Sequence, residues 1–140
     1  SPLASTARTS FALAAVTTNS LDFVILNTPA VDLLSSLTEE GVWRSFRGGI
    51  LRRWHAHGEL VADLMRIVTP KCHPLRVPRE RVLLIEARYD TLVPAWQTEA
   101  LWEAWGRPPR VRYGQGHITN FALNGGRILQ VSCRFIRSVQ

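Results

Sequence analysis

The stretch RVLLIEARYDTLVP, residues 81–94, decides the fold class of this 140-residue chain. Its first half, residues 81–87, has a solid apolar centre rather than an alternation of apolar and polar residues. Such a run is typical of a strand that is buried on both faces of a parallel sheet. A short polar loop follows, and Pro94 stands where a helix can begin.

The segments around this strand repeat the alternation of helix and strand. A second continuous apolar run lies in residues 21–27, and a short strand is expected at residues 110–113. Between the strands, the apolar face of Leu101, Trp102 and Trp105 predicts a helix over residues 95–105, with Gly106 as its stop. Further helices are expected over residues 6–16 and 127–139. The chain is therefore predicted to be α/β, with a mostly parallel sheet flanked by helices.

The region between the first two predicted strands is less regular. Residues 31–68 have a helical but interrupted pattern. A plausible amphipathic stripe, formed by Leu60, Val61, Leu64, Met65 and Ile67, marks the end of this region. The prolines that follow, Pro70, Pro74 and Pro78, predict an extended connector.

Composition narrows the class of protein. A chain of 140 residues with 46% apolar and 20% charged residues is long enough for one globular domain. The net charge of +6 does not come from a dense basic run or a recognisable module, so nucleic acid is not the expected partner. No apolar run reaches the length of a membrane helix, and Cys72 and Cys133 are expected to be reduced thiols. We expect a cytoplasmic protein without a membrane segment.

Two loops contain side chains that can act in catalysis. Residues 88–94 follow one predicted strand and present Asp90, whereas residues 114–120 follow the next strand and present His117. Active groups of parallel sheets lie in loops at the carboxyl ends of the strands, so these two side chains are expected to meet. A carboxylate that accepts a hydrogen bond from one imidazole nitrogen leaves the other nitrogen to act as a base. Either residue alone is more often a turn residue than a catalytic one, but their order on consecutive strands favours the catalytic interpretation.

Over most of its length, and most specifically from residue 81 to residue 121, the sequence resembles the C-terminal half of an α/β-hydrolase. The resemblance implies a serine hydrolase that cleaves carboxylic esters without a cofactor, with Asp90 and His117 as acid and base of a Ser-Asp-His triad. It also implies that residues 1–140 form a single partial domain lacking the N-terminal strands, with residues 31–70 as a helical lid or cap. Such a domain would belong to a longer chain or pair with a second polypeptide that completes the sheet. The alternative is a non-catalytic α/β domain that serves interaction or structure.

Ser5 is the candidate nucleophile. It precedes the alanine-rich helix and lies sixteen residues before the strand at residues 21–27. The family places its nucleophile in the frame G-x-S-x-G, on a sharp turn between strand and helix. Here Leu3 and Ala7 stand in the two glycine positions. An equally weighted interpretation of Ser5 is a helix N-cap.

A zinc site is the other arrangement that the sequence raises. His55, His57, Cys72 and His73 are residue types that bind zinc. Their spacing does not match a structural zinc site, because paired ligands on both sides are missing. We therefore expect no metal and no cofactor, and a small-molecule ester as the substrate.

Overall fold

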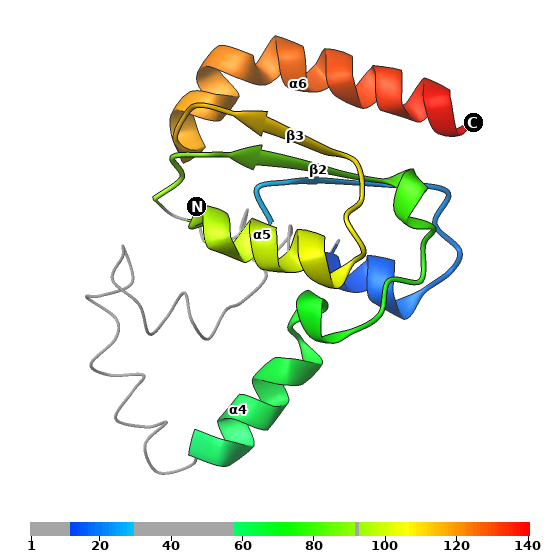
Figure 1. Ribbon diagram of the computed structural model, residues 1–140, viewed down its shortest axis with the longest axis vertical. Coiled ribbons are helices and arrows are strands. Elements are labelled where there is room, and N and C mark those ends of the chain that lie inside the picture. The colour runs from blue at the N-terminus through cyan, green and yellow to red at the C-terminus, as the bar shows by residue number, and fades with distance from the viewer. Residues whose placement is uncertain (1–11, 30–57, 92) are drawn as a thin grey trace.

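The computed structural model of the protein describes residues 12–29, 58–91 and 93–140 (Figure 1). Residues 12–17 are helical and lie just before the first strand. The labelled elements are β1 Val24–Asn27, α4 Gly58–Ile67, the 3-10 turns η1 Pro70–Cys72 and η2 Arg79–Arg81, β2 Val82–Ala87, α5 Ala95–Ala104, β3 Arg110–Tyr113 and α6 His117–Val139.

The strands of the described ranges form one parallel sheet in the order β1-β2-β3. Val24 is in register with Val82, and Leu84 is in register with Arg110. Helix α6 lies on one side of this sheet, whereas α5 and the helical residues 12–17 lie on the other side (Figure 1). The predicted α/β class, with a parallel sheet flanked by helices, is confirmed.

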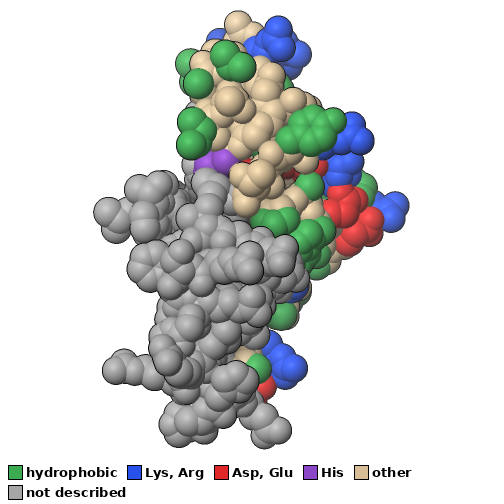
Figure 2. Space-filling model, turned by 90° about the vertical axis from the view of Figure 1, so that its left-hand side faces the viewer, with side chains coloured by type: hydrophobic (Ala, Val, Ile, Leu, Met, Phe, Trp, Pro, Cys, Tyr) green, Lys and Arg blue, Asp and Glu red, His purple; other side chains and the backbone are tan. Residues whose placement is uncertain are grey.

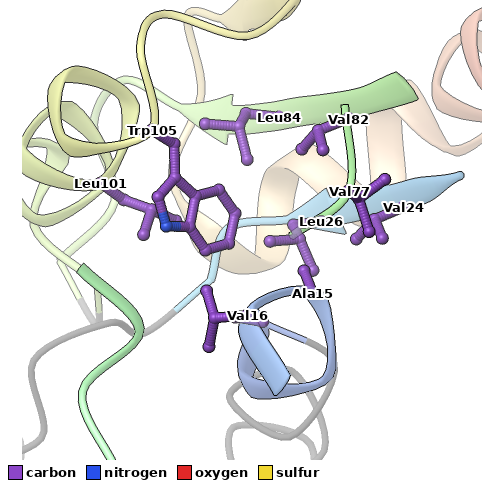
Figure 3. Close-up of a cluster of buried hydrophobic side chains, with 10 residues drawn as sticks. Ala15, Val16, Val24, Leu26, Val77, Val82, Leu84, Leu101 and Trp105 are labelled. Carbon is purple, nitrogen blue, oxygen red and sulfur yellow. The ribbon is translucent and has the colours of Figure 1, made fainter. Parts of the chain in front are cut away.

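The apolar core fills the space between the sheet and α5. Leu26 and Leu84 are register partners, so both point to the same face of the sheet. Leu101 of α5 and its C-cap residue Trp105 pack against that face together with the helical residues 12–17 (Figure 3). The buried cluster consists of Ala12, Ala15, Val16, Val24, Leu26, Val77, Val82, Leu84, Leu101 and Trp105. The apolar side chains that predict the helix over residues 95–105 therefore face the core.

Strand β2 is buried along its whole length, as its continuous apolar run predicts. Leu83 and Ile85 alternate with the residues of the core face and so point to the opposite side of the sheet, where α6 lies. Strand β2 is also the middle strand of the three, paired with β1 on one edge and with β3 on the other. Its carboxyl end is therefore held in a fixed position for the loop that follows.

Replacement of Leu84 with alanine is expected to destabilise the fold by about 2 to 5 kcal/mol, because the side chain is fully buried and leaves a cavity. Urea unfolding measures this as a lower midpoint at an unchanged slope. Leu123→Ala is the matched control, because 70% of the Leu123 side chain is exposed. The control is expected to change stability by less than about 0.5 kcal/mol. Equal effects of the two substitutions would contradict the position of the core.

Helix α5 ends where the sequence predicts. The backbone N–H of Trp105 donates to Leu101 at 3.0 Å, and the next residue, Gly106, has a φ of 72°. That left-handed conformation favours glycine because it carries no Cβ. Pro108 and Pro109 then bring the chain back into β3.

The start of helix α6 differs from the one predicted from the sequence. The helix was expected to begin at residue 127, after a loop that extends to residue 120, but it begins at His117. The backbone N–H of Gly116 donates to Thr119 Oγ1 at 3.0 Å, and the N–H of Asn120 donates to the Gly116 carbonyl at 2.8 Å. These bonds stabilise the first turn and outweigh the low helix propensity of Gly125 and Gly126.

The region before β2 also differs from its expectation. The side chains of Leu60, Leu64 and Ile67 on α4 are 61%, 51% and 64% exposed, so these members of the amphipathic stripe are not buried. The proline-rich connector is not uniformly extended, because it contains η1 and η2. Within the described ranges, every helix is too short or too polar to cross a membrane.

Candidate active site

The loops after β2 and β3 lie against each other at the carboxyl end of the sheet. The N–H of Arg88 donates to the Tyr113 carbonyl at 2.8 Å, and the N–H of Tyr89 donates to the Gln115 carbonyl at 3.1 Å. These bonds extend the pairing of the two strands into the loops. Figure 2 views the molecule from this end, and histidine side-chain atoms reach the surface there.

Asp90 and His117 are in direct contact. Asp90 Oδ2 lies 2.6 Å from His117 Nδ1, and the Asp90 side chain is fully buried. The other carboxylate oxygen, Oδ1, accepts a hydrogen bond from the backbone N–H of Val93 at 2.8 Å. The carboxyl group is therefore oriented by its own loop and directed at the imidazole ring.

Gly116 allows the close approach of the two loops. A Cβ atom at this position would lie 3.3 Å from the carbonyl oxygen of Tyr89, which is a backbone atom and moves only with its loop. Because Gly116 is also the N-cap of α6, its place fixes where the helix begins and where His117 stands. The short distance between the imidazole and the carboxylate depends on this packing of backbone against backbone.

The contact assigns a tautomer to the imidazole. An ionised carboxylate can only accept hydrogen bonds, so Nδ1 of His117 must donate its proton to Asp90. The lone pair of the neutral ring then lies on Nε2, the nitrogen that can take a proton from a nucleophile. The arrangement can support general base catalysis followed by general acid catalysis.

Most of the other predicted site features fall outside the described residues. Ser5 is outside the described residues, as is most of the expected lid, residues 31–70. His55 and His57 are also outside them, whereas His73 Nε2 lies 2.9 Å from the carbonyl of Ile67 at the end of α4. In the described ranges, no three His, Cys, Asp or Glu side chains gather closely enough to hold a metal ion.

A group of buried amides was missed from the sequence. Asn120 and Asn124 are buried one turn apart on α6, and Asn124 Nδ2 donates to Asn120 Oδ1 at 3.1 Å. Asn124 Nδ2 also donates to Gln115 Oε1 in the loop that precedes His117. These bonds tie the loop to the helix. The signal in the sequence was the i, i+4 spacing of the two asparagines, which becomes visible once the helix is known to start at His117.

A cluster of charged side chains on β2, β3 and α5, next to the two loops, was also not predicted from the sequence. Glu86 on β2 is buried among the apolar residues of its strand and forms an ion pair with Arg112 on β3. Glu99 on α5 forms ion pairs with Arg112 and with Arg110, the latter at 2.6 Å. The guanidinium of Arg110 lies 3.7 Å from the centre of the Trp102 ring. The lone Glu within an apolar run, opposite two alternating arginines, was the sequence signal for this cluster.

The pKa values of the two acids in this cluster are shifted in opposite directions. Burial raises the pKa of Glu86 above its ordinary value, although the charges of Arg112 and Arg110 act against this. Burial also acts to raise the pKa of Glu99, but the hydrogen bond and the charge of Arg110 and the charge of Arg112 outweigh it and leave the pKa lowered. The cost of desolvation therefore falls mainly on Glu86.

Hydrolases are among the solved structures with a similar fold. Puromycin hydrolase matches 79% of this chain with a TM-score of 0.58 at 19% identity, and a variant of it complexed with PGG matches with a TM-score of 0.59. A hydrolase from Pseudomonas aeruginosa PA01 matches 92% of the chain with a TM-score of 0.50 at 14% identity. The chain spans 17% of the puromycin hydrolase and 61% of the Pseudomonas protein. At these identities, the likeness concerns the fold.

The chain matches no family model. Its sequence is 31% identical over 100 residues to uncharacterized protein YdjC of Bacillus subtilis (strain 168), and the match covers 69% of this chain and 85% of that protein. Identity of this extent over most of a relative's length reflects common descent. The chain therefore belongs to the same family as YdjC.

Proposed function

We propose that the protein is a serine hydrolase of the α/β-hydrolase type that cleaves carboxylic esters. The observation that carries the proposal is the 2.6 Å contact between His117 Nδ1 and the buried carboxylate of Asp90. The two residues follow adjacent parallel strands, in the chain order acid then histidine that this class of enzyme uses. The fold likeness to puromycin hydrolase and to the Pseudomonas hydrolase supports the same class.

Ser5 is proposed as the nucleophile, on the evidence of its place in the sequence before the helical residues 12–17 and β1. His117 Nε2 would take the proton from the Ser5 hydroxyl as its oxygen bonds to the ester carbonyl carbon. The imidazolium would then give that proton to the leaving alcohol oxygen as the C–O bond breaks. A water molecule would attack the acyl-serine in the same way, returning the serine and releasing the acid. Asp90 would hold the imidazole and stabilise its charged form.

The remaining features of the proposal come from the resemblance. Residues 31–70 would form a lid over the site and would select the acyl group of the substrate. A second polypeptide or further residues of a longer chain would complete the sheet beside the nucleophile. The proposed chemistry needs no cofactor.

A fluorophosphonate probe tests the proposed function, because it reacts only with a serine that is activated as a nucleophile. We expect the probe to label the protein and to form its adduct on Ser5, as peptide mass spectrometry would show. Ser5→Ala is expected to abolish labelling. Ser10→Ala is the matched control and is expected to keep it, because Ser10 lies within the predicted helix.

Two results would contradict this assignment. An adduct on a different serine would reject Ser5 as the nucleophile. A folded protein that shows neither labelling nor ester hydrolysis would favour the non-catalytic α/β interaction domain, to which the Leu3 side chain in place of an elbow glycine also points.

A further inference from the structure

The ion cluster around Glu86 lies at the ends of the two strands, next to the loops that carry Asp90 and His117. Glu86 is the register partner of Arg112, and their side chains form an ion pair on the α5 side of the sheet. Asp90 lies four residues beyond Glu86, and His117 lies five residues beyond Arg112. The ion pair therefore joins β2 and β3 just before each strand ends and its loop begins.

The cluster is costly for a role in stability alone. Only 2% of the Glu86 side chain is exposed, and its Oε2, which lies 3.8 Å from Arg110 Nη1, has no hydrogen-bond partner among the described residues. Removal of a carboxylate from water is expensive, and an ion pair at such a site often contributes no more stability than apolar residues of similar size. A buried charge pair can instead define one arrangement of the strands.

The arrangement that it defines is the register of β2 against β3. Shifting either strand by one residue would move Glu86 or the two arginines to the opposite face of the sheet and leave the charges unpaired. Glu99 holds the same arginines from α5, and Trp102 covers the guanidinium of Arg110. Side chains from β2 and α5 thereby hold the two arginines, and with them the position along the sheet at which each loop begins.

We propose that Glu86 is a positioning residue, which acts through Arg112 to hold the His117 loop at hydrogen-bonding distance from Asp90. The expected effect on catalysis rests on the proposed function. The expected effect on the contact between His117 and Asp90 does not. Loss of the pair lets β3 and its loop relax relative to β2. The imidazole then loses part of its alignment with the carboxylate.

Glu86→Gln tests the proposal, because it removes the charge and keeps the shape of the side chain. The first measurement is the proton NMR resonance of His117 Nδ1, assigned by its absence in His117→Gln. A short hydrogen bond to a carboxylate gives a strongly downfield and slowly exchanging signal. We expect this signal to shift upfield or to vanish by exchange in Glu86→Gln.

The second measurement is ester hydrolysis. We expect kcat of Glu86→Gln to fall by about 10- to 100-fold with KM unchanged, because small errors in the placement of a catalytic group have effects of that order. Glu103→Gln is the matched control, since Glu103 on α5 forms an exposed ion pair with Arg107, which follows the helix. The control is expected to leave both the resonance and kcat unchanged.

Arg112→Gln provides a second variant, which removes the same ion pair from the other strand, at a side chain that is 43% exposed. It is expected to reproduce the loss of the His117 signal. An unchanged signal in a folded Glu86→Gln or Arg112→Gln protein would overturn the proposal, and so would failure of both variants to fold, which would assign the cluster to stability. A wild-type protein without ester hydrolysis would contradict the proposed function alone, because the NMR signal still tests the positioning.

Discussion

His117→Ala is expected to lower kcat/KM for short acyl esters by a factor on the order of 10⁴ to 10⁶. In the proposed mechanism, the imidazole supplies both the general base for the nucleophile and the general acid for the leaving group, and the members of such a triad act as a unit. Hydrolysis of a chromogenic short-chain ester, followed under single-turnover and steady-state conditions, measures the loss.

His73→Ala is the matched control for this experiment. His73 contacts the carbonyl oxygens of Arg66 and Ile67 at the end of α4 and takes no part in the contact with Asp90. We expect this variant to keep its activity within about twofold, in line with the small effect of most surface substitutions. Turnover in His117→Ala at the wild-type rate would reject the proposed mechanism.

Asp90→Asn is expected to lower kcat by a factor on the order of 10⁴, with little change in the folded structure. The amide oxygen can still accept the hydrogen bond from the Val93 N–H, which Asp90 Oδ1 accepts at 2.8 Å. The amide nitrogen would then face His117 Nδ1 as a donor. The imidazole would carry its proton on Nε2 and could no longer accept one from the nucleophile.

The pH dependence of the residual activity separates this effect from a loss of folding. At high pH, hydroxide can replace the missing base, so the rate of Asp90→Asn is expected to rise with pH beyond the range in which the wild-type rate is constant. Asp63→Asn is the control, because Asp63 is an exposed residue that pairs with Arg66 on α4. Equal effects of the two substitutions would contradict the role of Asp90.

The fold class could be predicted because burial leaves a direct mark on the sequence. Strand β2 is covered on both faces, and its apolar run over residues 82–85 is typical of such a strand. The end of α5 was predictable for a similarly local reason, since Gly106 adopts a left-handed conformation. The start of α6 was not predictable in this way. Its first turn is stabilised by Thr119 and by the packing of Gly116 against Tyr89, and Tyr89 belongs to a different loop.

By itself, the sequence determined which residues carry the candidate chemistry and on which edge of the sheet they lie. Asp90 and His117 follow consecutive buried strands, and parallel strands end at one edge. Only the tertiary structure decided that the two side chains are in contact, because their 2.6 Å separation depends on backbone bonds between the loops and on the N-cap of α6. Only the tertiary structure paired Glu86 with Arg112, since residues so far apart along the chain meet through strand register, a property of the sheet.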